Sequence, residues 1–97
     1  MIPYGKQTID KDDINSVVEV LKSDFLTTGP NVKEFEEKFA SYVGSRYAIA
    51  VSSGTAALHL ASLVSGIGKS DEVLTSPMTF AASANCALYC NATPVFV

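Results

Sequence analysis

The sequence predicts an α/β fold in which two helices precede a β-α-β-α-β unit with parallel strands. Short apolar runs at 47–51, 72–75 and 93–97 alternate with stretches of helical character at 55–64 and 80–89. Crossovers of roughly a dozen residues between short strands favour parallel pairing. The near-continuous apolar character of the strands and of the first crossover helix also predicts that both faces of the sheet are buried.

The two leading helices are predicted from their ends and from apolar periodicity. Asp10 suits the start of the first helix, and the acidic residues at 12–13 fall in its first turn, where the helix dipole favours negative charge. Pro30 suits the first position of the second helix, and Gly44 suits its C-terminal cap. Both segments should be amphipathic, with apolar positions at Ile14, Val17, Val18 and Leu21, and then at Val32, Phe35, Phe39 and Val43.

Composition restricts the class of protein. The chain has 97 residues, 47% of them hydrophobic, which is enough for one small domain. Its net charge of −3 and the absence of a Lys/Arg cluster argue against a nucleic-acid partner. No apolar run reaches membrane-spanning length, and the first residues lack the charged-then-apolar pattern of a signal peptide. We therefore expect a cytoplasmic protein that binds neither nucleic acid nor membrane.

Several polar and sulfur-containing residues are interpreted as structural. Cys86 and Cys90 share one helical face, so we expect reduced, buried thiols. His59 is the only histidine and should hydrogen-bond a neighbouring element, so no metal site is predicted. The charged residues of the second helix are interpreted as a solvated face made of Glu34, Glu36, Glu37 and Lys38.

The segment 52–58, Ser-Ser-Gly-Thr-Ala-Ala-Leu, has the features of an anion-binding turn. It follows a predicted strand and opens a helix, so Thr55 and Ala56 should present free N–H groups to a ligand. Gly54 would let the backbone approach that ligand closely. The segment matches neither the dinucleotide nor the P-loop pattern, and a plain start of a buried helix is the alternative interpretation.

A second turn, at 75–80, follows the next predicted strand and leads to Phe80. Ligands of open α/β sheets bind at the carboxyl ends of the strands, so both turns should lie at the same edge. Phe80 could then lay its ring on a ligand whose phosphate is held by the first turn, although a core position is the alternative. No nucleophile with its base, and no carboxylate pair in motif context, is present, so no catalytic residue is predicted.

The ordered motifs resemble the N-terminal part of the sugar aminotransferases of the DegT/DnrJ/EryC1/StrS family. The similarity covers nearly the whole chain, and several motifs in the right order are more specific than any one of them. The chain also ends inside an apolar strand pattern, as expected of the front of a longer protein. The resemblance depends on Tyr4, Asp10, 26–29, Phe35-Glu36, 52–58, 77–80 and 92–97.

This resemblance implies a pyridoxal 5'-phosphate (PLP) enzyme with the aspartate-aminotransferase fold. Residues 1–97 would form the N-terminal portion of one large domain, incomplete at its C-terminus. By resemblance, Thr55 and Ala56 hold the cofactor phosphate and Phe80 stacks on the pyridine ring. The positions that line the sugar-nucleotide site in such enzymes correspond to Tyr4, Asp24, Phe25, Leu26, Thr27 and Gly54.

The resemblance also implies substrates and an assembly. Family members transfer an amino group from glutamate to a nucleotide-linked keto sugar, and they assemble as homodimers. The stretches 4–10 and 23–29 look most like the transaminases of pseudaminic acid biosynthesis, which act at C4 of a UDP-4-keto-6-deoxy-N-acetyl-hexosamine. The lysine that binds the cofactor covalently lies beyond Val97. A histidine at that position would indicate a sugar dehydratase, and a small α/β module that binds a phosphorylated metabolite without catalysis is a further alternative.

Overall fold

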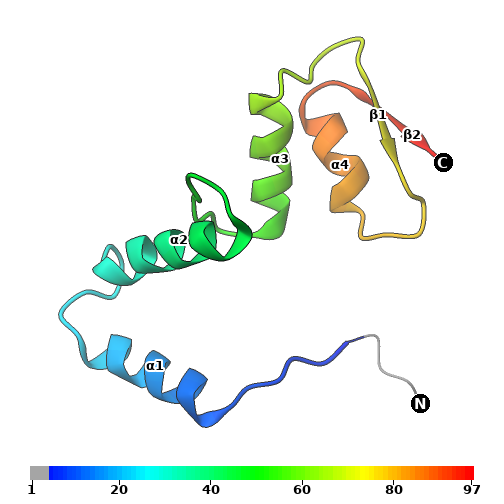
Figure 1. Ribbon diagram of the computed structural model, residues 1–97. Helices are drawn as coiled ribbons and strands as arrows, with labels where there is room; N and C mark the ends of the chain where they lie inside the picture. Colours follow the sequence, from blue (N-terminus) through cyan, green and yellow to red (C-terminus); the bar gives the residue numbers. More distant parts are fainter. Residues whose placement is uncertain (1–4) are drawn as a thin grey trace. The chain divides into compact units, whose positions relative to one another are not determined.

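The computed structural model describes residues 5–97, which form parts of two compact units. The first unit ends at Ala50 and the second begins at Val51. Four helices and two parallel strands confirm the predicted α/β class (Figure 1). In chain order the elements are α1 (Lys11–Lys22), α2 (Pro30–Val43), α3 (Gly54–Val64), β1 (Glu72–Thr75), α4 (Ala82–Tyr89) and β2 (Thr93–Phe96).

Helix α1 begins where the sequence predicts, because a reciprocal capping box closes its N-terminus. The Asp10 carboxylate accepts hydrogen bonds from the N–H groups of Asp12 at 2.8 Å and of Asp13 at 3.0 Å. The Asp13 carboxylate accepts in return from the Asp10 N–H at 3.0 Å. Three backbone donors that no helical carbonyl can reach are thereby satisfied.

We predict that Asp10→Ala lowers the free energy of unfolding by about 1 kcal/mol, because it removes the acceptor that caps α1. Asp10→Asn is the matched control, since its side-chain oxygen can still accept both bonds. Thermal unfolding followed by circular dichroism measures the difference. An alanine variant as stable as the asparagine variant would contradict the role of the cap.

Helix α2 also has the predicted ends. Pro30 occupies its first turn, and Gly44 adopts the left-handed conformation at the C-terminal cap with φ of 70°. The N–H of Ser45 donates to the Ala40 carbonyl at 2.9 Å, which completes a common glycine-based helix end. Both ends follow from local sequence alone.

The solvated face of α2 is confirmed for three of its four charged residues. Glu34 and Glu37 are exposed and pair with Lys38 and Lys33 one turn away. The hydrogen bond from Lys38, and then its positive charge, lower the pKa of the Glu34 carboxyl. Glu36 does not fit the prediction, because it is half-buried and its carboxylate accepts a hydrogen bond from the Ala50 N–H at 2.7 Å.

The strand predicted at 47–51 does not form. A strand needs a neighbouring chain to take its N–H and C=O groups, and no such neighbour lies beside this segment in residues 5–97. The Ser45 hydroxyl donates to the Tyr47 carbonyl at 2.8 Å, and the Glu36 carboxylate holds the N–H of Ala50. The Arg46 guanidinium lies 5.3 Å from the centre of the Tyr47 ring. Side chains therefore take the place of a strand partner here.

The second unit contains the predicted parallel pair. β1 and β2 align with Glu72 opposite Thr93 and Thr75 opposite Phe96. Helix α4 connects them and contacts both, and α3 packs against α4. The ring centroids of His59 on α3 and Tyr89 on α4 are 5.3 Å apart, so His59 contacts the neighbouring helix through its ring, while the hydrogen bond predicted for its side chain does not form within residues 5–97.

Small side chains make the core of this unit, and the predicted burial of both sheet faces is wrong for the described chain. Leu74 on β1 and Phe96 on β2 remain 69% and 57% exposed. Helix α4 is the helix that packs against the two strands, and one helix cannot cover both faces of a sheet. The thiols are free and buried, as predicted. The buried residues are Ser62, Ala82, Cys86, Ala87, Cys90 and Ala92.

None of the helices within residues 5–97 combines the length and the apolar composition that crossing a bilayer requires.

Candidate cofactor and substrate site

The N-terminus of α3 lies in the predicted anion-binding turn. Ser53 is the N-cap, and its hydroxyl accepts a hydrogen bond from the Ala56 N–H at 3.2 Å. The prediction of a free N–H at Ala56 is therefore wrong, because serine at an N-cap satisfies the donor three residues ahead. The N–H groups of Gly54 and Thr55 have no acceptor within residues 5–97. They remain the available donors of this turn.

Space around the turn is open. A Cβ added to Gly54 would meet no atom within 4 Å, so packing inside the described chain does not require glycine there. Thr55 is half-buried, and its hydroxyl makes no hydrogen bond to another described residue. Two amides and one hydroxyl without a partner in residues 5–97 thus belong to the first turn of α3, and this donor set suits a phosphate.

The second turn leaves Phe80 outside α4, which begins at Ala82 and not at Phe80 as predicted. The Phe80 carbonyl accepts from the Ser83 N–H at 3.0 Å, which fixes the backbone at the entrance to the helix. The Phe80 side chain is 72% exposed, and that of Met78 is 93% exposed. Within the described residues, Phe80 is therefore a surface ring and not a core residue.

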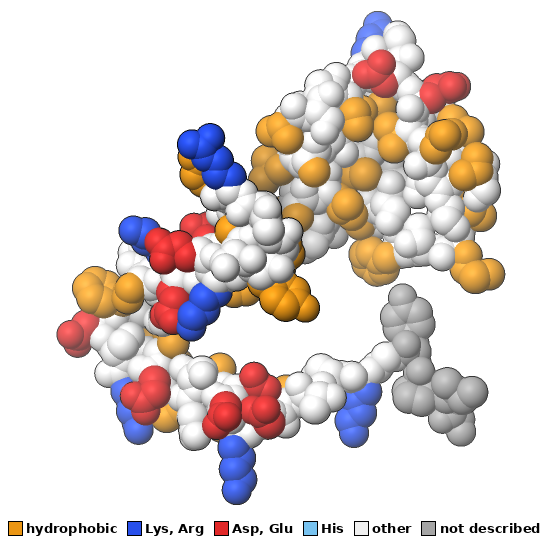
Figure 2. Space-filling view, viewed as in Figure 1, with side chains coloured by type: hydrophobic (Ala, Val, Ile, Leu, Met, Phe, Trp, Pro, Cys, Tyr) orange, Lys and Arg blue, Asp and Glu red, His pale blue; other side chains and the backbone are white. Residues whose placement is uncertain are grey.

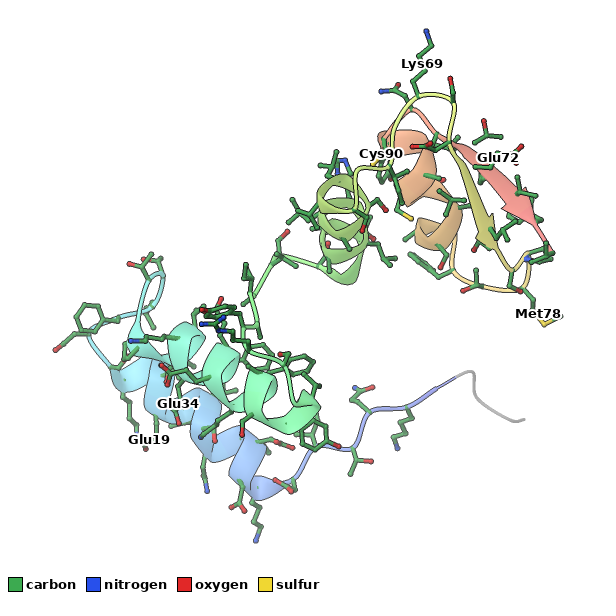
Figure 3. The ribbon with its side chains drawn as sticks, turned by 45° about the horizontal axis from the view of Figure 1, so that its top comes forward. Glu19, Glu34, Lys69, Glu72, Met78 and Cys90 are labelled. Carbon is green, nitrogen blue, oxygen red and sulfur yellow. The ribbon has the colours of Figure 1, made fainter. Side chains whose placement is uncertain are left out.

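Both turns lie on the same side of the second unit. The N-terminal ends of α3 and α4 and the C-terminal end of β1 point the same way in Figure 1. Figure 3 labels Lys69 and Met78, which lie toward opposite ends of β1. The structure therefore brings Gly54, Thr55 and Ala56 to the same edge as the turn that carries Phe80.

Among residues 51–97, no charged side chain lies at this edge. Lys69, Asp71 and Glu72 are the only Lys, Arg, Asp or Glu residues after position 50, and they lie at the opposite end of β1 (Figure 3). Hydrophobic side chains cover much of the visible face of this unit (Figure 2). An anion bound at the two turns would be held by amides, by the Thr55 hydroxyl and by the helix dipole.

The remaining predicted substrate residues belong to the first unit. Asp24, Phe25, Leu26 and Thr27 form the connection between α1 and α2, while Tyr4 lies outside the described residues. The Ser23 hydroxyl accepts from the Phe25 N–H at 3.3 Å. A groove of about 800 Å³ runs between the two helices. Of the predicted substrate residues within 5–97, only Phe25 lines this groove, together with Val17, Val20, Leu21, Pro30 and Phe35.

A family model matches the part of the chain that contains these features. The model of the DegT/DnrJ/EryC1/StrS aminotransferase family matches residues 7–97, which include both turns and the connection between α1 and α2. The chain belongs to this family. This match confirms the family resemblance that the ordered motifs predicted.

Three relatives illustrate the similarity. The spore coat polysaccharide biosynthesis protein SpsC of Bacillus subtilis is 50% identical and covers 98% of this chain. A UDP-4-amino-4,6-dideoxy-N-acetyl-beta-L-altrosamine transaminase of Campylobacter jejuni is 46% identical over the whole chain. The PLP form of Spr1654 from Streptococcus pneumoniae, assigned as a sugar aminotransferase, superposes on 99% of the chain with a TM-score of 0.86 and 38% identity.

The DegT/DnrJ/EryC1/StrS chain spans about a quarter of the length of each of these relatives, 24%, 26% and 24% respectively. Its fold is that of the matched part of a solved aminotransferase.

Two contacts were missed by reasoning from the sequence. Ser53 was detectable, because serine directly before a helix is a preferred N-cap. Glu36 was not, since a carboxylate on a charged helix looks like its solvated neighbours until its partner is known. The one available signal was its place in the Phe35-Glu36 motif.

Proposed function

We propose that this chain is the N-terminal part of the large domain of a PLP-dependent sugar aminotransferase. The enzyme transfers an amino group from glutamate to C4 of a UDP-4-keto-6-deoxy-N-acetyl-hexosamine, as in pseudaminic acid biosynthesis. It works as a cytoplasmic homodimer. Family membership supports the reaction class, and the altrosamine transaminase among its relatives supports this sugar.

The observation that carries the proposal is the pairing of the two turns at one edge. The α3 N-terminus offers the amides of Gly54 and Thr55 with the Thr55 hydroxyl, and Phe80 presents an exposed ring in the neighbouring turn. A phosphate and a flat heteroaromatic ring are the two parts of PLP, so the residues present fit this cofactor. Ala56 contributes its N–H only if the Ser53 hydroxyl releases it.

The role of these residues is to bind PLP and to orient its ring. PLP, when bound, supplies the aldehyde and the electron-withdrawing ring that carry an amino group. Thr55 and the first amides of α3 hold the phosphate, which fixes the position of the ring. Phe80 offers a flat apolar face that restricts the tilt of the ring and excludes water from one side. The covalent lysine is expected outside residues 1–97.

The sugar nucleotide is assigned to a second group of residues. We assign Tyr4, Asp24, Phe25, Leu26 and Thr27, together with Gly54, to its binding. The connection between α1 and α2 is well suited to this role, because it exposes the large side chains of Phe25 and Leu26 at 57% and 65%. Gly29 keeps it compact, since a Cβ there would lie 2.8 Å from the Phe25 Cβ.

The test uses the intact protein that contains this chain. We expect the visible absorption of protein-bound PLP, and an amino-sugar product from a UDP-4-keto sugar and glutamate. Absence of PLP binding would refute the proposed function and favour the non-catalytic binding module. PLP binding with loss of a sugar hydroxyl and no amino product would favour the dehydratase. Amination of other keto sugars alone would refute the pseudaminic assignment.

Phe80→Ala should weaken PLP retention about fivefold, because stacking contributes about 1 kcal/mol beyond buried area. Met78→Ala is the matched control, since Met78 lies in the same turn and is more exposed. Equilibrium dialysis of PLP from the two variants gives the comparison. Equal retention in both variants would show that the Phe80 ring does not contact the cofactor.

A further inference from the structure

We propose that Asn85 is a further phosphate-binding residue of the cofactor site. Its side-chain N–H donates to the same phosphate that Thr55 and the first amides of α3 hold. This role deepens the proposed function and rests on it. All of the groups involved belong to the second unit, because α3 and α4 both follow Val51.

Thr55 lies on the face of α3 that α4 covers. Four residues of α3 are not exposed, and their spacing follows one side of the helix: Thr55, Ala56, His59 and Ser62. The element that packs against α3 within residues 5–97 is α4. Thr55 is therefore directed toward α4.

A ring contact fixes the register of the two helices. Both helices run the same way, with their N-terminal ends at the ligand edge (Figure 1). The ring centroids of His59 and Tyr89 are 5.3 Å apart, so these two residues lie at the same level. Residues four apart share a helical face, and both helices rise equally per residue. One turn toward the N-termini, Thr55 and Asn85 therefore lie at matching levels on the facing sides.

The side-chain amide of Asn85 is available to a ligand. The side-chain hydrogen bonds of α4 within residues 5–97 are those of Ser83 and Cys86, so this amide has no partner there. Asn85 is half-buried, and no fully buried side-chain N or O atom of the described chain lacks a partner, so its amide stays accessible. Side chains of a helix lean toward its N-terminus, which directs this amide to the ligand edge.

The chemistry of this amide suits an anion. An asparagine side chain carries two N–H donors and no charge. Among residues 51–97, Lys69 is the only lysine or arginine, and it lies toward the other end of β1 (Figure 3). A phosphate at this edge therefore depends on neutral donors, and Asn85 adds one from α4 to those that Gly54 and Thr55 offer from α3.

The experiment compares three variants of the intact protein with the wild type. Asn85→Ala removes the amide, and Asn85→Asp keeps its shape but puts a negative charge beside the phosphate. Asn91→Asp is the matched control, because it makes the same change just beyond the opposite end of α4. Titration with PLP and with pyridoxal, which lacks the phosphate, separates contact with the phosphate from contact with the ring.

We expect Asn85→Ala to raise the Kd for PLP about tenfold, as loss of one bond to a charged group predicts. Asn85→Asp should raise it by about a further tenfold or more through repulsion, and added salt should reduce this extra loss. Neither variant should change the Kd for pyridoxal, and Asn91→Asp should change neither Kd. If the aspartate variant fails to fold, the alanine variant makes the same comparison of the two ligands.

An unchanged Kd for PLP in the Asn85 variants would overturn the proposal. Equal rises for PLP and pyridoxal would also overturn it, because the phosphate would then not be the contact. Equal losses in the alanine and aspartate variants would place Asn85 away from the phosphate. If the wild-type protein binds no PLP, the proposed function fails, and inorganic phosphate becomes the probe for the same variants. Binding of neither ligand would overturn both proposals.

Discussion

Replacing Thr55 with valine should weaken binding of PLP to the intact protein by about ten- to a hundredfold. Valine keeps the shape of threonine but lacks the hydroxyl that we assign to the cofactor phosphate. A hydrogen bond to a charged group contributes about 1.5–3 kcal/mol, which corresponds to this range in Kd. Titration of the apoprotein with PLP, followed by absorption, measures the change.

Thr55→Ser is the matched control, since it restores the hydroxyl and should recover most of the affinity. The hydroxyl of Thr55 has no partner within residues 5–97, so Thr55→Val should leave the unfolding temperature nearly unchanged. A serine variant as weak as the valine variant would contradict the role of the hydroxyl. A valine variant that binds PLP normally would exclude the Thr55 hydroxyl from the phosphate site.

Replacing Ala87 with leucine should destabilise the protein by about 1–3 kcal/mol, because the position has no room for three further carbon atoms. Ala87 is 0% exposed, and α4 contacts α3 and both strands. Its carbonyl also accepts from the N–H groups of Cys90 at 3.0 Å and Ala92 at 2.9 Å, so the backbone around it cannot shift freely. Chemical unfolding followed by circular dichroism measures the loss.

Ala61→Leu makes the same change at an exposed position of α3 and should shift the free energy of unfolding by less than about 0.5 kcal/mol. Equal stability of the two variants would show that Ala87 is not in a tightly packed core. The comparison also tests whether small residues, and not the exposed large ones, hold the second unit together.

The ends of α1 and α2 were predictable because the groups that define them are neighbours in sequence. Asp10 caps α1 through N–H groups two and three residues ahead, and Gly44 ends α2 through its own left-handed conformation. β1 was likewise predicted with the right bounds, since its apolar run is clearly delimited. The second turn followed from the end of β1, whereas the first was predicted to follow a strand at 47–51 that does not form.

Strand formation at 47–51 could not be predicted in the same way. Its apolar pattern suits a strand, but pairing depends on a partner that local sequence does not specify, and none lies beside it within residues 5–97. Burial of both sheet faces failed for the same reason, because Leu74 is apolar whether or not another element covers it. An apolar pattern shows which side chains a segment could bury, but it does not show whether another element covers them.

The sequence by itself determined the α/β class, the ends of α1 and α2 and, through motifs in order, the family. Tertiary structure alone decided that Glu36 reaches Ala50, that Ser53 occupies the Ala56 amide, and that Phe80 stands exposed before α4. The physical reason is that a cap or a periodic face is encoded within a few residues. The partner of a polar side chain is chosen by whichever unsatisfied group the folded backbone brings within about 3 Å of it.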